Sequence, residues 1–233
     1  MPPVAAPPVV AIVPMKGHSA RVPKKNLRPM CGRPLYHWIT KTLLAAKGVD
    51  RVVIETDSDE IEADVAASFP DITVLRRPVH LHGDDTPMNA VLDNAMRQLP
   101  QDAIFLQSHS TNPLLKVATV EKALADYLAD GEHDSLFAVT RWQTRFFWAD
   151  GRPVNHNPDE LLPTQDLPPL YEENSNLYIF TRTSFDKRGH RIGTAPKMYE
   201  MEYIEAVDID EIQHFDLAEA LLERAIARGE VTP

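Results

Sequence analysis

The sequence has almost no cysteine, and Cys31 is the only one. A single cysteine excludes an intrachain disulfide and a cysteine-rich zinc site. A reducing compartment suits such a chain, and we expect a cytoplasmic protein. No apolar run approaches the roughly 18 residues of a membrane span, so we expect no membrane partner. Residues 1–8 are rich in proline and alanine and lack the basic start of a signal peptide, which predicts a short flexible lead.

An excess of positive charge is missing as well. The chain has 24 Lys and Arg against 34 Asp and Glu, which gives a formal net charge of −10 at pH 7. Nonspecific nucleic-acid binding needs a broad basic surface, so we expect no nucleic-acid partner. Hydrophobic residues make up 43% of the chain, which argues against disorder. Its 233 residues suffice for one large α/β domain or for a core with an insertion.

The best-known phosphate-binding motifs are also missing. The chain contains neither G-x-x-x-x-G-K-[ST] nor G-x-G-x-x-G, which disfavours a kinase-like P-loop and a dinucleotide site. No two histidines have the spacing of zinc ligands. No Ser–His–Asp arrangement rises above chance.

What the chain does contain is a regular alternation of strand-like and helix-like segments. This alternation predicts an α/β fold with a mostly parallel sheet. The expected strands are 9–13, 51–55, 72–75, 103–106, 135–140, 177–180 and 204–209. The expected helices are 34–47, a segment ending at 69 after the capping sequence 56–60, 87–99, 117–129 and 211–228.

The pattern breaks between residues 141 and 171. This stretch is rich in proline and carries the aromatic residues Trp142, Phe146, Phe147 and Trp148. We interpret it as an insertion into a core formed by 1–140 and 172–233. Exposed aromatics beside prolines often mark a protein–protein contact. The alternative is an ordinary long loop packed on its own domain.

A basic loop follows the first expected strand. Ligands of open α/β sheets bind beyond the carboxyl ends of the strands, where this loop lies. Gly17 allows close approach of the backbone. Such a loop suits a nucleoside triphosphate and could neutralise a pyrophosphate leaving group; the alternative is a solvated basic loop. Its four cations are Lys16, Arg21, Lys24 and Lys25.

A pair of aspartates, Asp208 and Asp210, ends the last expected strand. Residues two apart in a strand face the same side, so both carboxylates would converge on one cation. Magnesium commonly takes one or two carboxylates together with waters and substrate phosphates. The pair therefore predicts a Mg²⁺ site that faces the basic loop across one cleft; the alternative is a strand end with a helix cap.

Two further polar segments are candidates for binding. Arg76-Arg77-Pro78 offers planar guanidinium donors for a base or phosphate, or is simply a surface cation pair. Glu172-Glu173-Asn174 precedes an expected strand and could bind the hydroxyls of a sugar or an amine, or form a solvated turn.

In their order along the chain, these motifs resemble the acylneuraminate cytidylyltransferase (CMP-sialic acid synthetase) family. The family opens with a strand and an A-R-G-G-S-K-x-x-P-x-K-N motif, which matches residues 13–26. The resemblance covers residues 9–222. Its further segments here are Gly32-Arg33-Pro34-Leu35, Thr56-Asp57-Ser58, Arg76-Arg77-Pro78, Gln165-Asp166-Leu167-Pro168-Pro169, Glu173-Asn174, Asp208-Ile209-Asp210 and Phe215-Asp216-Leu217-Ala218-Glu219.

The resemblance implies a three-layer, Rossmann-like nucleotidyltransferase fold with helices on both faces of the sheet. It implies a cytidylyltransferase that joins CTP to a sialic-acid-like (nonulosonic) sugar acid, with Mg²⁺ as cofactor, giving a CMP-sugar and pyrophosphate. It also implies a homodimer in which residues 141–171 are the dimerisation element and complete the partner's site.

The resemblance also assigns residues to roles. Lys16 and Lys25 would be catalytic. The nucleotide would be bound by Lys16, Gly17, Ser19, Arg21, Lys25, Asn26, Arg77 and Thr86. The acceptor would be bound by Gln107, Glu173 and Asn174, and magnesium by Asp208 and Asp210.

The chain departs from the family pattern at several positions. Lys16 replaces an arginine, and His18 replaces a glycine. A serine-rich stretch becomes 85–88, which implies the loss of a ribose-contacting hydroxyl, and the segment 106–113 is longer than in the family. Glu172 stands where many bacterial members carry arginine, which disfavours an anionic acceptor group and favours an amine.

Two alternatives follow from these departures. One is the same transfer to another acid, such as an eight-carbon sugar acid or an amino phosphonate. The other is a nucleotide-binding protein without turnover.

Overall fold

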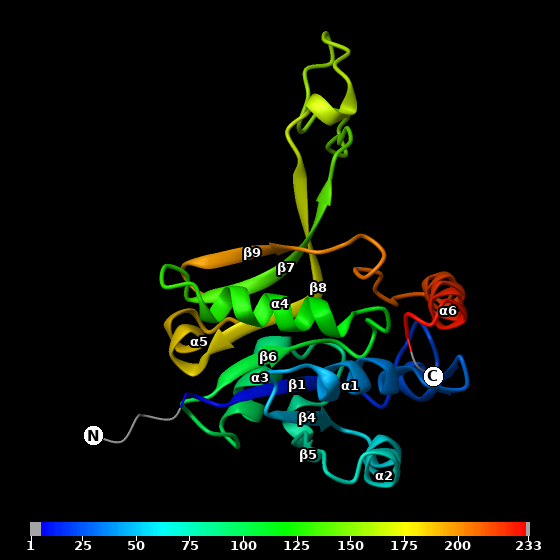
Figure 1. Ribbon diagram of the computed structural model, residues 1–233, viewed down its shortest axis with the longest axis vertical. Coiled ribbons are helices and arrows are strands. Elements are labelled where there is room, and N and C mark those ends of the chain that lie inside the picture. The colour runs from blue at the N-terminus through cyan, green and yellow to red at the C-terminus, as the bar shows by residue number, and fades with distance from the viewer. Residues whose placement is uncertain (1–5, 232–233) are drawn as a thin grey trace.

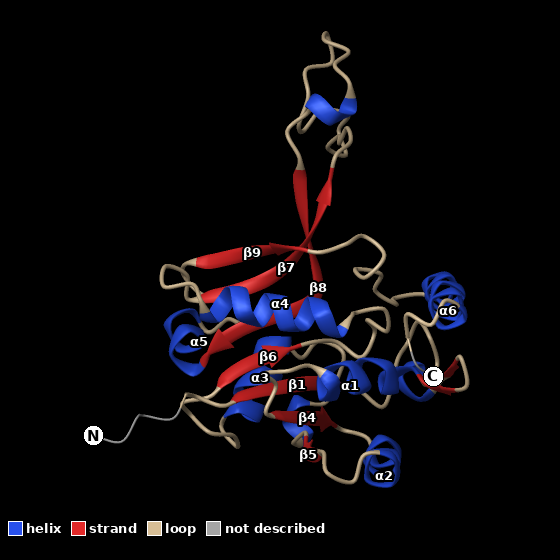
Figure 2. Cartoon of the chain, in the orientation of Figure 1, coloured by secondary structure: helices blue, strands red, loops and turns tan. Residues whose placement is uncertain are grey.

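A seven-stranded sheet forms the centre of the molecule, in a computed structural model that describes residues 6–231 (Figures 1 and 2). Of the lead expected at 1–8, residues 1–5 lie outside the described residues. The strand order is β5-β4-β1-β6-β8-β7-β9. Their bounds are β1 Val9–Met15, β4 Arg51–Thr56, β5 Thr73–Arg76, β6 Ile104–Gln107, β7 Ser135–Trp142, β8 Leu170–Thr181 and β9 Pro196–Glu200. A small hairpin, β2 (Pro29–Met30) and β3 (Arg33–Pro34), stands apart from this sheet.

Most of the strands run parallel, as the alternation predicts. Parallel pairing joins β5, β4, β1 and β6 in turn and also joins β7 to β9. Strand β8 alone runs against its neighbours β6 and β7. All seven residues of β1 are buried, because a central parallel strand is covered on both faces. The carboxyl ends of β1, β4 and β6 therefore meet at one edge of the sheet, as expected for a ligand site.

Helices cover both faces, which confirms the three-layer fold. Val9, Ala11 and Val13 face one core with α1, α2 and α4, and Val10 and Ile12 face the other with α3 and α5. Helix α6 packs separately on Met30, Leu35 and Trp38. The helices are α1 Leu35–Ala45, α2 Asp59–Ser68, α3 Met88–Met96, α4 Val117–Leu128, α5 Arg182–Arg188 and α6 Ile212–Ala227, with short 3₁₀ turns at Lys25–Leu27, Val79–Leu81 and Thr164–Asp166.

The strand expected at 204–209 is wrong. Residues 201–210 form turns and irregular backbone, and the sheet edge is occupied instead by β9. In this segment Glu205 and Ile209 are buried while Ile204 is 55% exposed, so burial does not alternate from residue to residue as it would in a pleated strand. Helix α5 was likewise not expected.

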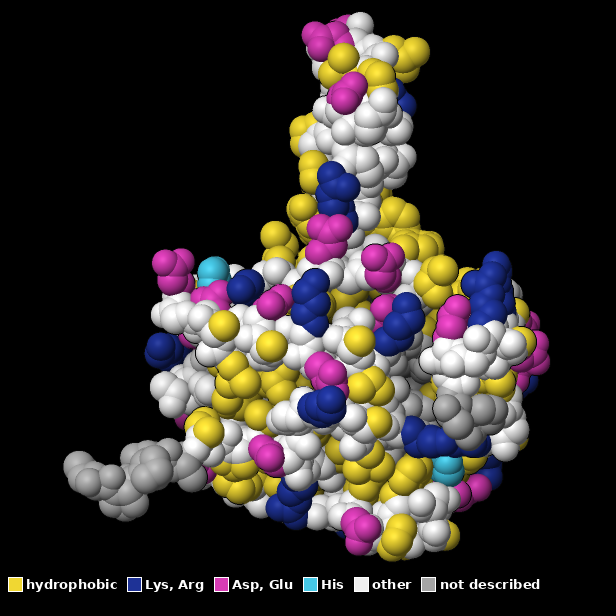
Figure 3. All heavy atoms as spheres, in the orientation of Figure 1, with side chains coloured by type: hydrophobic (Ala, Val, Ile, Leu, Met, Phe, Trp, Pro, Cys, Tyr) yellow, Lys and Arg dark blue, Asp and Glu magenta, His cyan; other side chains and the backbone are white. Residues whose placement is uncertain are grey.

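Strands β7 and β8 continue beyond the sheet as a ribbon that carries residues 143–169 away from the body (Figure 1). We call residues 143–169 the arm. Phe147 and Trp148 are more than half exposed on it, and Leu161 is 91% exposed. Figure 3 shows hydrophobic side chains gathered at the tip and around the base of the arm. Within residues 6–231, no helix combines the length and apolarity that crossing a membrane requires.

Candidate active site

The basic loop leaves β1 at the carboxyl edge of the sheet and lies against the β4–α2 turn. The Gly17 N–H donates to Asp57 Oδ1 at 2.7 Å. A Cβ on residue 17 would lie 2.7 Å from Ser58 Cβ, closer than real contacts allow. Lys16 Nζ reaches the other way and donates to the Gly83 carbonyl at 2.9 Å. The loop thus spans two neighbouring turns, and only glycine fits its closest approach.

Asn26 holds the far end of the loop. Its Nδ2 donates to the Lys16 carbonyl at 2.8 Å, and its Oδ1 accepts from Ser110 Oγ at 2.7 Å. Asn26 is buried, whereas Ser19 Oγ accepts a weaker bond from the Val22 N–H at 3.4 Å. Asn26 therefore fixes the shape of the loop from beneath.

The basic loop and the aspartate pair meet. Arg21 Nη2 lies 2.5 Å from Asp210 Oδ1, and Lys25 Nζ donates to the Ile209 carbonyl at 2.5 Å. The Ile209 N–H donates to the Thr111 carbonyl at 3.1 Å, which seats this segment beside the turn after β6. Residues 208–210 are irregular backbone, so this segment meets the basic loop without the strand that the sequence suggested.

Charges at this meeting point are tightly coupled. Burial raises the pKa of Asp208, and the charge of Asp210 adds to that shift. Burial lowers the pKa of Lys25, although Asp208 and Asp210 act in the opposite direction. Each group is thus partly desolvated and close to opposite charge. Such shifts are typical of functional sites.

The donor set at the aspartates fits a magnesium ion. Asp208 Oδ1 is buried and has no hydrogen-bond partner among the described residues. Nowhere in residues 6–231 do three or more His, Cys, Asp or Glu gather as metal ligands. Two carboxylates suit magnesium, which usually completes its shell with waters and substrate phosphates.

The two neighbouring arginines take opposite positions. Arg76 is exposed and pairs with Asp59 at 2.6 Å and Glu62 at 3.0 Å. Arg77 is buried and grips Glu55 with Nε and Nη2 at 2.9 and 2.5 Å, leaving Nη1 without a partner. Its guanidinium thus ties the ends of β4 and β5 together, and the unpartnered Nη1 is buried as well.

Thr86 lies in the turn that Lys16 reaches, but among the described residues no hydrogen bond links it to another assigned nucleotide residue. Its Oγ1 donates to the His82 carbonyl at 3.3 Å. It shares the 82–86 turn with Gly83, which Lys16 contacts.

Two assigned acceptor residues meet around an arginine that the sequence analysis missed. Arg191 Nη1 donates to Gln107 Oε1 at 2.8 Å, and Nη2 donates to the Tyr178 hydroxyl at 2.8 Å. The Tyr178 hydroxyl in turn donates to Glu173. Asn174 does not join this group, because its Nδ2 donates to Thr140 Oγ1 within the β7–β8 ribbon at 3.1 Å. No motif surrounds Arg191, and 84 residues separate it from Gln107, so the sequence offered no signal.

His109 links the acceptor group to the basic loop. Its Nε2 lies 3.4 Å from Arg191 Nη1. Burial lowers the pKa of His109 to about 3, and the charges of Arg191 and Lys25 add to the shift. His109 is therefore neutral, and it is close to two cations, Lys25 of the basic loop and Arg191 beside the assigned acceptor residues.

Glu172 bonds to Trp142 at the end of β7 and does not join this group. Its Oε2 accepts from Trp142 Nε1 at 2.8 Å. The next residue, Glu173, lies 3.6 Å from Arg191 Nη2. The charge argument drawn from Glu172 therefore left out the cation that the fold supplies.

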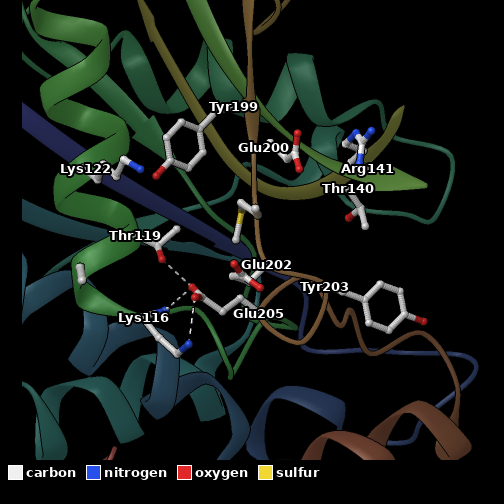
Figure 4. A pocket seen from close by; sticks show the side chains of 12 residues that line it. Lys116, Thr119, Lys122, Thr140, Arg141, Tyr199, Glu200, Glu202, Tyr203 and Glu205 are labelled. Atoms are coloured by element: carbon white, nitrogen blue, oxygen red, sulfur yellow. Dashed lines mark hydrogen bonds and ion pairs between the residues drawn. The ribbon is translucent and has the colours of Figure 1, made fainter. Parts of the chain in front are cut away.

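A separate polar cavity of about 490 Å³ lies between α4, β9 and the base of the arm. Glu205 is buried beside it and accepts from Thr119 Oγ1 at 2.6 Å and from the Lys116 N–H at 3.1 Å (Figure 4). None of the residues assigned to the nucleotide, acceptor or metal lines this cavity.

Comparison with known proteins gives one consistent result. A family model described as cytidylyltransferase matches residues 10–230. The chain is 28% identical over 212 residues to an N-acylneuraminate cytidylyltransferase of Oncorhynchus mykiss, covering 87% of this chain and 48% of that protein. The chain thus spans about half the length of the first curated relatives it matches.

A bacterial relative matches over nearly its full length. A CMP-N,N'-diacetyllegionaminic acid synthase of Legionella pneumophila is 26% identical over 229 residues, covering 92% of this chain and 96% of that protein. Among solved structures, a CMP:2-keto-3-deoxy-manno-octonic acid synthetase complexed with CTP superposes with a TM-score of 0.70. It is 14% identical and covers 93% of this chain and 99% of that chain, a likeness of fold.

Proposed function

The chain belongs to the cytidylyltransferase family, and from this membership we propose that it joins CTP to a sialic-acid-like, nonulosonic sugar acid. The products are a CMP-sugar and pyrophosphate. The observation that carries the proposal is the meeting of the basic loop with the aspartate pair, through Arg21 on Asp210 and Lys25 on the Ile209 carbonyl. In this proposal the cations neutralise a triphosphate, and the carboxylates beside them hold its metal ion.

The basic loop binds the triphosphate in this proposal. Lys16 and Lys25 neutralise the phosphates and the departing pyrophosphate, and the backbone at Gly17 approaches them closely. Asn26 keeps the loop in shape through its bonds to Lys16 and Ser110. Asp208 and Asp210 would hold Mg²⁺, which when bound neutralises phosphate charge and makes the α-phosphorus more electrophilic.

The reaction is an in-line displacement. A hydroxyl oxygen of the acid forms a bond to the α-phosphorus as the bond from that phosphorus to the bridging oxygen breaks, and pyrophosphate leaves. The hydroxyl loses its proton in the process. Catalysis of this kind depends mainly on positioning and charge neutralisation. Gln107 and Glu173 lie with Arg191 where the acceptor would bind.

We further propose a homodimer formed through the arm. Phe147 and Trp148 are exposed there, and aromatic side chains are enriched in protein interfaces. A cytoplasmic location remains a prediction from the single cysteine, Cys31.

The proposal is tested by pyrophosphate release. Purified protein with Mg²⁺ is offered each of the four nucleoside triphosphates with nine-carbon sugar acids, an eight-carbon sugar acid and an amino phosphonate. We expect release only with CTP and a nine-carbon acid. Release with the eight-carbon acid or the phosphonate alone would move the protein to another substrate class. Tight CTP binding by calorimetry with no release from any acceptor would make it a binding protein.

A further inference from the structure

Arg191 is held in place by three separate elements. It lies in the loop between α5 and β9, and its backbone N–H donates to Asn89 Oδ1 on α3 at 3.2 Å. Its guanidinium donates to Gln107 at the end of β6 and to Tyr178 on β8. The guanidinium carbon lies 3.7 Å from the centre of the Tyr178 ring. The plane and position of this cation are therefore fixed before any ligand binds.

The positive charge of Arg191 is poorly compensated. Its side chain is only 12% exposed, yet among the described residues its one carboxylate partner is Glu173, 3.6 Å away and 44% exposed. Gln107, Tyr178 and a neutral His109 are its other neighbours. Burying a cation without a well-placed anion is costly.

Arg77 shows what a compensated buried arginine looks like in the same fold. Its guanidinium bonds Glu55 through Nε at 2.9 Å and Nη2 at 2.5 Å, and both side chains are fully buried. Arg191 has no such pair. Its hydrogen bonds use Nη1 and Nη2, and none to a described residue uses Nε. The Nε donor of this planar guanidinium is therefore free within the described part of the chain, and guanidinium donors match the geometry of a carboxylate ligand.

We propose that Arg191 binds the carboxylate of the acceptor acid and thereby selects a sugar acid over a neutral sugar. The inference rests on the proposed function and adds the group that reads the substrate's charge. The position suits that role, because His109 lies 3.4 Å from Arg191 Nη1 and is also close enough to Lys25 for the charge of Lys25 to lower its pKa. It also explains how the chain recognises an acid while carrying Glu172, whose carboxylate is engaged by Trp142.

The first test compares how variants of Arg191 affect the two substrates, the sugar acid and CTP. Arg191→Gln should raise KM for the sugar acid on the order of 10- to 100-fold, the loss expected for a charge-assisted pair. KM for CTP, and CTP affinity by calorimetry, should change by no more than about twofold. Arg191→Lys keeps the charge without the fork and should fall between. Lys187→Gln removes an exposed charge from nearby α5 and should behave as wild type.

The second test uses the substrate and needs no variant to fold. The carboxamide of the same sugar acid should be used by the wild type with KM raised as much as Arg191→Gln raises it for the acid. With the carboxamide, Arg191→Gln should cause little further loss, because contacting partners are not additive.

The outcomes distinguish the two proposals. A wild type that uses the acid while Arg191→Gln leaves its KM unchanged would overturn the role of Arg191 alone. The role of Arg191 would also be overturned if the KM increases caused by Arg191→Gln and by the carboxamide multiplied when the two were combined. A wild type that uses no sugar acid with CTP would overturn the proposed function, and this inference with it.

Discussion

Asp208 and Asp210 are two residues apart in the sequence and lie in different surroundings. Asp208 is mostly buried, with a raised pKa and an unpartnered Oδ1. Asp210 is 44% exposed and already pairs with Arg21 at 2.5 Å. The irregular backbone at 208–210 allows this, whereas a regular strand would give both residues one environment. Any ion held between them would meet one preorganised carboxylate and one that must exchange Arg21 for the metal.

Asp210→Asn should separate activity from stability. An exposed ion pair contributes roughly 0–1 kcal/mol, so the melting temperature should fall little. Turnover of CTP should fall by roughly 100-fold or more, since a charged metal ligand acts on the transition state by several kcal/mol. Asp150→Asn weakens an exposed Asp–Arg pair in the arm and serves as the control. A variant that keeps near-normal turnover would remove Asp210 from the metal site.

Gly17→Ala should damage the basic loop. The added Cβ would meet Ser58 Cβ at 2.7 Å and displace the backbone that bonds Asp57. We expect CTP affinity, measured by calorimetry, to fall by roughly 10-fold, a loss of about 1.4 kcal/mol. Gly131→Ala is the matched control, because nothing lies within 4 Å of a Cβ there. Equal CTP affinity in both variants would contradict a binding role for the Gly17 backbone.

The sequence carries local information about the site and little about its long-range contacts. The basic loop and the aspartate pair could be recognised because each is a short cluster of like groups. Arg191 could not, because its role depends on Gln107 and Tyr178 in other strands. The burial of Arg77 was equally hidden, since an Arg-Arg pair looks the same whichever side chain turns inward.

At the scale of elements, the best-predicted segments are those with a strong period and central burial. Strand β1 and helices α1 and α4 lie close to their expected bounds, because each contributes a continuous apolar face to the core. Strand β9 was missed because it is an edge strand with only half-buried and exposed residues, so it shows no alternation. Edge strands depend on pairing more than on their own side chains.

The start of β9 is anchored by one carboxylate. Asp134 accepts from the N–H groups of Thr194 and Ala195, both at 3.0 Å, and from Thr194 Oγ1 at 2.8 Å. Gly193 passes so close that a Cβ there would lie 2.2 Å from Asp134 Oδ1. The same loop carries Arg191, so Asp134 also helps to position the acceptor group.

This anchor predicts a pH dependence of stability. Burial pushes the pKa of Asp134 upward, but hydrogen bonds from Ala195 and Thr194 outweigh it and hold that pKa below its usual range. The ionised carboxylate therefore stabilises the fold above the unfolded-state pKa of roughly 3.9, and this contribution is lost as pH falls through the lower folded-state pKa.

Thermal unfolding of the wild type and of an Asp134 variant at several pH values tests this predicted pH dependence. Asp134→Asn should lower the melting temperature at pH 7, because its amide presents a donor to other donors. The gap to wild type should begin to narrow below about pH 4 and disappear once pH falls below the folded-state pKa. Asp71→Asn changes an exposed carboxyl and should show no gap. An Asp134→Asn gap that is the same in acid would assign the effect to packing rather than charge.

At the scale of the whole molecule, the arm projects from the body and exposes apolar side chains to solvent. The sequence indicated an insertion from its prolines and aromatics, but not its projection, because that follows from β7 and β8 pairing beyond the sheet edge. An arm with Phe147, Trp148 and Leu161 exposed on its own is poorly suited to a monomer in water. A second copy of the chain is the occupant that the homodimer proposal supplies.

Mixing two defective variants tests whether the arm acts on the partner. One variant carries Asp210→Asn with an intact arm, and the other carries Phe147→Ser and Trp148→Ser with an intact core. Each alone should have little activity: the first lacks a proposed metal ligand, and the second should be monomeric by sedimentation, because the two aromatics are the exposed anchors. In a mixture, a heterodimer pairs an intact core with a partner's intact arm, so activity should return to a substantial part of the wild-type level.

Full activity of the second variant as a monomer would show that each site is complete within one chain. If both variants formed dimers but mixing them restored no activity, the arm would serve only to join the two chains and would not contribute to the partner's site.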